Sequence, residues 1–163
     1  MAEETKKMTL KANDGKIFEI EEDIARMSGV LKAIIDEKCC DKSLVPLPNV
    51  DGSNLAKIIE FLRKHQEFRK TADQSGDAKA FNRNFFDGLK DRCEMVELLK
   101  AANYLAIKEL LDVVAQGIAD RIKNMTLEKV RSFFGVESDY TQEEENAFRE
   151  KYFWAFEGLD DED

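Results

Sequence analysis

The side chains best suited to covalent or metal chemistry are one histidine and three cysteines. A cysteine nucleophile needs an imidazole within hydrogen-bond reach of its thiol, and no local motif pairs His65 with a thiol. Cys39 and Cys40 are adjacent, whereas about two to four residues separate the cysteines of a zinc knuckle. The third cysteine, Cys93, stands alone. We therefore predict no catalytic residue, no metal site and no cofactor.

The other polar motifs have structural interpretations. His65 falls at the end of an amphipathic pattern, where we expect a solvated imidazole. The acidic run at 143–145 puts negative charge at a helix start, which the helix dipole favours. The glycines are scattered, so there is no glycine-rich phosphate loop. The sequence predicts a binding protein and not an enzyme.

Composition excludes several partners. The chain has 163 residues, 43% of them hydrophobic, which suits one domain or one domain with a helical extension. A net charge of −9 opposes binding to nucleic-acid phosphates. No run of about eighteen apolar residues could span a membrane, and residues 1–7 lack the apolar centre of a signal peptide. We expect reduced thiols and a location in the nucleus and cytoplasm.

The first segment is predicted to form a small sheet. Apolar side chains alternate over 8–12 and again over 18–20, as they do in β-strands. Asn-Asp-Gly at 13–15 lies between these runs, and its glycine supplies the positive φ of a tight hairpin. Pro46 and Pro48 require an extended segment, because two prolines two residues apart exclude a helix.

Helical spacing dominates the rest of the chain. Residues 55–62 predict a helix that ends near His65, and the polar stretch 66–80 predicts a mobile loop. The same spacing returns over 95–105 and 110–122. Two further helices should follow, one capped by Thr126 and ending at Gly135, the other opened by a capping box at Thr141–Glu144.

The last helix is predicted to carry more aromatic side chains than a small domain can bury. One interpretation is a terminal helix packed on its own core; the other is a partner-facing surface, because exposed aromatic clusters mark interfaces. The aromatic residues are Phe148, Tyr152, Phe153, Trp154 and Phe156.

Several motifs, in order, resemble those of one family. They are Asp14-Gly15-Lys16-Ile17-Phe18-Glu19-Ile20, Val45-Pro46-Leu47-Pro48-Asn49-Val50, Ala101-Ala102-Asn103-Tyr104-Leu105 with the run to Val113, residues 126–134, Tyr140 to Glu145, and Trp154-Ala155-Phe156-Glu157. From about Thr9 to Glu157, the chain resembles the Skp family of adaptors, plant members especially. These proteins link F-box proteins to a cullin in SCF ubiquitin ligases.

The resemblance implies an α/β fold of the BTB/POZ type, a three-stranded sheet flanked by helices with a C-terminal helical extension. Its parts would be 8–65 and 81–122 for the BTB/POZ-type portion, 66–80 for the loop, 123–157 for the F-box-binding helices and 158–163 for an acidic tail. It implies that Asn103 and Tyr104 contact the cullin. The residues that it assigns to F-box binding are Leu111, Ile118, Val130, Phe134 and Trp154, although core packing also explains Leu111 and Ile118.

Departures from the family pattern cluster in the F-box half. Gly88-Leu89 looks like an insertion, Leu127 replaces a usual proline, and Lys129 replaces a capping glutamate. Tyr152-Phe153 replaces a usual Asn-Gln pair before the tryptophan. These changes suggest a divergent member with an altered set of F-box partners.

Two other functions remain open at this point. The chain could be a scaffold that binds an F-box protein outside ubiquitin ligases, or another BTB/POZ adaptor of the elongin-C type. We also expect the free chain to self-associate, because a large apolar F-box interface would be uncovered in the absence of its partner.

Overall fold

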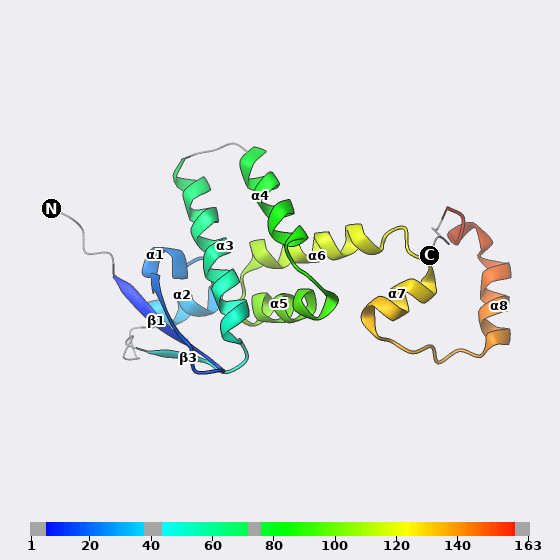
Figure 1. Cartoon of the computed structure of the whole chain (residues 1–163), viewed down its shortest axis with the longest axis horizontal. Coiled ribbons are helices and arrows are strands. Elements are labelled where there is room, and N and C mark those ends of the chain that lie inside the picture. The colour runs from blue at the N-terminus through cyan, green and yellow to red at the C-terminus, as the bar shows by residue number, and fades with distance from the viewer. Residues whose placement is uncertain (1–5, 38–43, 72–75, 159–163) are drawn as a thin grey trace. The chain divides into compact units, whose positions relative to one another are not determined.

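The computed structural model describes residues 6–37, 44–71 and 76–158, shown in Figure 1. The chain divides into two compact units, residues 1–115 and 116–163. This boundary falls inside helix α6 (Lys108–Ile122), and the division of binding roles after residue 122 stays a prediction. The adjacent cysteines, Cys39 and Cys40, and most of the predicted acidic tail lie outside the described residues.

The first unit contains a three-stranded sheet in the order β2-β1-β3. Strand β1 (Lys7–Ala12) pairs antiparallel with β2 (Ile17–Glu21) and parallel with β3 (Val45–Leu47). The predicted hairpin is confirmed, and Gly15 has the expected positive φ of 83°. The predicted extended segment is confirmed over Val45–Leu47, an edge strand, which is the position in a sheet that best tolerates proline, whereas Pro48 falls in a turn.

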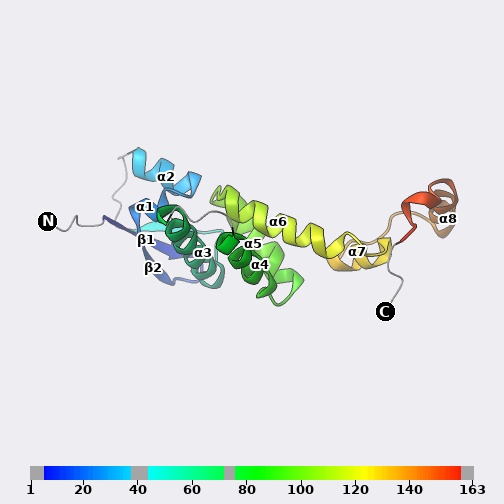
Figure 2. The same cartoon turned by 90° about the horizontal axis from the view of Figure 1, so that it is seen from above.

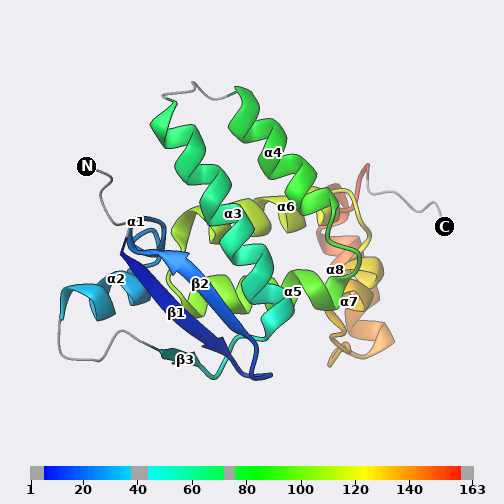
Figure 3. The same ribbon diagram turned by 60° about the vertical axis from the view of Figure 1, so that its left-hand side comes forward.

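Helices pack against this sheet and against one another. They are α1 (Glu22–Ala25), α2 (Gly29–Asp36), α3 (Gly52–Lys70), α4 (Gly76–Asp87), α5 (Arg92–Tyr104) and the start of α6. Figures 1 and 2 both show α3 between the sheet and α5, and Figure 3 shows α4 beside α3. The predicted apolar faces are buried, with Met8, Leu55, Met95 and Leu98 at 0% exposure. No helix in the described part of the chain is long and apolar enough to cross a membrane.

The prediction of a helix ending near His65 and a loop at 66–80 is wrong. Helix α3 continues to Lys70, and α4 already begins at Gly76. The reason is an aromatic cluster that joins the two helices. The ring centroid of Phe81 lies 6.1 Å from that of Phe61 and 5.9 Å from that of Phe68. Phe68 thus extends the apolar face of α3 by a further turn. Contact with α4 stabilises this added turn, because most helical stability in proteins comes from tertiary packing.

His65 is not solvated as expected. Its side chain is only 13% exposed, and its ring is stacked on Phe61 at a centroid distance of 4.1 Å. Its Nε2 lies 2.7 Å from Oδ1 of Asn82 on α4, and its Nδ1 lies 3.3 Å from a carboxylate oxygen of Glu109 on α6. The imidazole therefore belongs to the packing of α3 against α4 and α6.

The second unit contains the end of α6, α7 (Leu127–Phe134), α8 (Gln142–Lys151) and a short 3₁₀ helix, η1 (Phe153–Ala155). Thr126 caps α7, and Gly135 ends it in the left-handed conformation. The capping box of Thr141 and Glu144 is present. The aromatic segment is not one helix, however: α8 ends at Lys151, and the last aromatic residues follow in and after η1.

Candidate partner-binding surfaces

The expected cullin-contacting residues are the last two residues of α5. Asn103 is exposed and Tyr104 is half-buried. After them the chain turns sharply: Leu105 is the C-cap, and Ala106 has a φ of 52°, which is unusual for a residue other than glycine. The side chains of Asn103 and Tyr104 are thus presented beside a constrained turn.

This turn is fixed to the start of α2 in the core of the first unit. The hydroxyl of Ser28, which is fully buried, donates a hydrogen bond of 2.5 Å to the carbonyl oxygen of Leu105. The same hydroxyl accepts one from the backbone N–H of Leu31 and so caps α2. The N–H of Gly29 donates to the carbonyl of Ala106 at 3.2 Å. A Cβ at Gly29 would lie only 3.0 Å from that of Ala106.

The five residues expected to contact an F-box are divided between the units. Leu111 is half-buried in the first unit, and the other four belong to the second. Of these, Ile118 is only 7% exposed, so it presents little surface, and Val130 is half-buried. Phe134 and Trp154 are 42% and 69% exposed, which leaves both rings accessible to a partner.

A groove of about 360 Å³ lies between α7, α8 and η1 in the second unit. Its aromatic wall is built from ring contacts: Tyr140 meets Phe148 edge to face at 5.3 Å, and Phe148 stacks on Tyr152 at 6.3 Å. The residues that line the groove are Leu127, Arg131, Tyr140, Glu145, Phe148, Arg149, Tyr152, Ala155 and Phe156.

Sequence reasoning identified only part of this lining. It singled out the aromatic residues from Phe148 onward, and Leu127 as a departure, but it did not connect them with Tyr140 or with the charged residues. The missed signal is helical spacing, because Arg131 lies four residues after Leu127 and therefore on the same face of α7.

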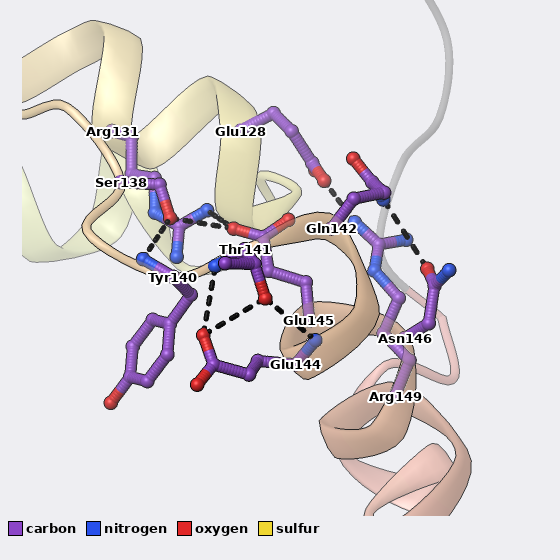
Figure 4. Close-up of polar contacts among 10 residues, drawn as sticks. All are labelled: Glu128, Arg131, Ser138, Tyr140, Thr141, Gln142, Glu144, Glu145, Asn146 and Arg149. Carbon is purple, nitrogen blue, oxygen red and sulfur yellow. Dashed lines mark hydrogen bonds and ion pairs between the residues drawn. The ribbon is translucent and has the colours of Figure 1, made fainter.

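Ion pairs tie α7 to α8 beside the groove, as the sticks in Figure 4 show. The guanidinium of Arg131 pairs with the carboxylate of Glu145, and the guanidinium of Arg149 pairs with that of Glu128. Ser138 adds a hydrogen bond of 2.7 Å from its hydroxyl to Oε1 of Glu145. This bond, together with the Arg131 guanidinium, lowers the pKa of the Glu145 carboxyl.

Arg149 also belongs to a second, smaller hollow in the same unit. Its guanidinium lies 5.6 Å from the ring centroid of Phe156, within reach of a cation–π interaction. A hollow of about 240 Å³ is lined by Arg149, Phe153, Phe156 and Glu157. The two hollows share Arg149 and Phe156, so these residues lie between them.

Comparisons with known proteins identify the family. The model described as "Skp1 family, tetramerisation domain" matches residues 6–67, and "Skp1 family, dimerisation domain" matches residues 108–155. SKP1-like protein 9 of Arabidopsis thaliana is 42% identical over 153 residues, which cover 94% of this chain and 99% of that protein. The chain belongs to the Skp1 family.

Other plant relatives extend over similar lengths. SKP1-like protein 1A of Arabidopsis thaliana is 40% identical over 160 residues, covering 93% of this chain and 98% of the relative. SKP1-like protein 20 of Oryza sativa subsp. japonica is 40% identical over 171 residues, covering 94% and 97%.

Family membership confirms the predicted fold, an α/β BTB/POZ-type domain with a C-terminal helical extension. It also settles the function at the level of the family. The chain is a non-catalytic adaptor of an SCF-type ubiquitin ligase, in the family that joins F-box proteins to a cullin.

Proposed function

We propose that this Skp1-family chain binds an F-box protein through its second unit and a cullin through the turn that follows α5. The exposed Phe134 and Trp154, together with the apolar groove, support the F-box assignment, because accessible aromatic side chains act as anchors in protein interfaces. The fixed presentation of Asn103 and Tyr104 supports the cullin assignment.

The observation that carries the proposal is the exposure of Trp154, at 69%. A tryptophan that contributes so little to the core of its own unit is suited to a partner's pocket. An adaptor of this kind acts by position: it holds two proteins in a fixed relation, so that ubiquitin transfer becomes effectively intramolecular.

The proposal is tested by the formation of a ternary complex. The chain is coexpressed with one F-box protein and the N-terminal part of a cullin, and size exclusion should yield a 1:1:1 complex. Asn103→Lys with Tyr104→Lys should release the cullin and retain the F-box protein. Matched lysines at the exposed Ser53 and Asn84, in the first unit and outside the turn, are expected to release neither.

Three other outcomes would contradict all or part of the proposal. A stable pair with the F-box protein that never recruits the cullin would replace the ligase adaptor with a scaffold. Retention of the cullin by the double lysine variant would refute the role assigned to Asn103 and Tyr104. No binding to any F-box protein would overturn the proposal as a whole.

We propose further that the free chain self-associates through its exposed aromatic side chains and that it resides in both nucleus and cytoplasm. Sedimentation of the free chain at tens of micromolar, roughly the range in which exposed apolar interfaces associate, should show species larger than a monomer. A fluorescent fusion would test the location. A clean monomer, or exclusion from either compartment, would contradict the respective statement.

A further inference from the structure

The groove between α7 and α8 has charged residues in a mainly apolar wall. Three charged side chains line it, Arg131, Glu145 and Arg149, and each has an oppositely charged partner within the second unit. The Arg131–Glu145 pair is mostly buried, with side-chain exposures of 20% and 14%. The Arg149–Glu128 pair is much more open, at 45% and 55%.

Burial makes the first pair sensitive to a bound partner. A docking partner displaces the remaining water from the wall, so an unpaired guanidinium there would lose its hydration without compensation. Glu145 supplies the compensating charge. The Ser138 hydroxyl, 2.7 Å from Oε1 of Glu145, holds the carboxylate in place beside Arg131. This part of the wall is therefore neutral before any partner arrives.

We infer that Glu145 is a specificity-determining residue: by neutralising Arg131, it restricts the groove to uncharged, apolar side chains of an F-box helix and excludes an acidic one. The inference rests on the proposed function, because it takes an F-box helix as the occupant of the groove. Removal of the Glu145 charge converts this part of the wall from neutral to cationic and should reverse this preference.

A purely structural role for Glu145 makes a different prediction. Glu145 also connects α8 to α7, so its loss could loosen the groove and weaken every partner alike. The readout that separates the two roles is therefore a ratio of affinities, between partners that differ only in charge. A looser groove has no reason to favour an acidic side chain over its neutral isostere.

The experiment uses the full chain and one purified F-box protein that binds it. Each apolar residue of the F-box motif is changed in turn to Asn and to Asp, and dissociation constants are measured by calorimetry. With the unmodified chain, the Asp variant at the groove-filling position should bind more weakly than the Asn variant. With Glu145→Gln, the Asp/Asn affinity ratio at that position should rise about tenfold, a modest value for a close charge pair across an interface.

Two further variants are controls, one for misfolding of the groove and one for the loss of an exposed charge. Arg131→Met with Glu145→Met restores a neutral wall of similar volume, so apolar selectivity should persist. Glu128→Gln removes the partner of the exposed Arg149, where water compensates the guanidinium, and the ratio should stay near that of the unmodified chain.

The possible results separate this inference from the proposed function. A ratio that rises with Glu145→Gln and is normal in the double methionine variant supports the inference. An unchanged ratio, with all affinities lowered together, overturns the inference and leaves the proposed function intact. Failure of the unmodified chain to bind any F-box protein overturns both.

Discussion

The turn after α5 is held by a buried hydrogen bond from a side-chain hydroxyl and by backbone hydrogen bonds, whereas the groove between α7 and α8 is held by ion pairs and ring contacts. Ser28, at 0% exposure, anchors the turn in the first unit. In the second unit, no residue of α7, α8 or η1 is fully buried, and Phe153 and Trp154 are among the most exposed large side chains described.

This difference predicts which substitutions change the stability of the fold and which change only partner binding. A residue that positions the turn belongs to a packed core, so its loss should affect folding and cullin binding together. An exposed aromatic residue of the second unit, such as Trp154, contributes little to its own unit and should affect binding alone. On the proposed assignment, the adaptor combines a turn fixed by core hydrogen bonds with a surface that a partner completes.

The largest expected effect on binding is that of Trp154→Ala. We expect it to weaken the F-box complex by about 2–4 kcal/mol, the range of an aromatic interface anchor. Because Trp154 is 69% exposed, the free energy of unfolding should change by less than about 0.5 kcal/mol. Calorimetry of binding and urea denaturation followed by circular dichroism measure the two quantities.

Phe61→Ala is the matched control, because this ring is fully buried in the first unit. It should lower the free energy of unfolding by about 3–5 kcal/mol. If Trp154→Ala destabilised the free chain to a similar extent, the contrast between the two regions would be wrong.

The next largest effect is that of Ser28→Ala on the turn. The substitution removes the cap of α2 and the 2.5 Å hydrogen bond to Leu105, whose carbonyl keeps only a longer bond of 3.4 Å from the N–H of Val30. We expect the free energy of unfolding to fall by about 2 kcal/mol, with weaker cullin binding and unchanged F-box binding.

The exposed Ser53, on α3, provides the comparison for this variant. Ser53→Ala should leave the free energy of unfolding, measured by urea denaturation, within about 0.5 kcal/mol of that of the unmodified chain. Equal destabilisation by both serine substitutions would show that the buried hydrogen bond to the turn has no special role.

Acidification should affect the second unit through Glu145. Its pKa is lowered by the Ser138 hydrogen bond and the Arg131 guanidinium, so the ionised form is favoured in the folded state. Its contribution to stability is present above the ordinary glutamate pKa and is lost as the pH falls from there through the lowered pKa of the folded state. Denaturation followed by the fluorescence of Trp154, the only tryptophan, reports this unit.

Glu145→Gln removes the titrating group and should flatten that part of the pH profile. Glu94 of the first unit also has a lowered pKa, chiefly through its hydrogen bond from Lys57, so Glu94→Gln serves to identify any acid effect that belongs to the first unit. An unchanged profile in Glu145→Gln would remove Glu145 as the cause.

What the sequence predicted correctly was local. The hairpin at Gly15, the cap at Thr126 and the capping box at Thr141 depend on a few adjacent residues, and all are confirmed. The extension of α3 past His65 could not be foreseen, because it depends on Phe81 and Asn82 of another helix.

In the candidate sites, too, only local features were predicted from the sequence. Motif matching pointed to Asn103 and Tyr104, but not to the hydrogen bond from Ser28, which is 77 residues away from Leu105 in sequence. Nor did it reveal that Arg131 meets Glu145, because that pair forms only when α7 and α8 come together. Pairings of this kind depend on tertiary contact, which periodicity does not encode.

The smallest expected effect is that of Glu128→Gln on the α7–α8 connection. The Arg149–Glu128 pair is exposed on both sides, so water replaces most of what the pair supplies, and Arg149 keeps its position over the ring of Phe156. We expect the free energy of unfolding to change by less than about 0.5 kcal/mol, and to change less at high salt. A loss above about 1 kcal/mol in urea denaturation would exceed the range of an exposed pair. It would mean that this pair, and not the more buried Arg131–Glu145 pair, holds the groove together.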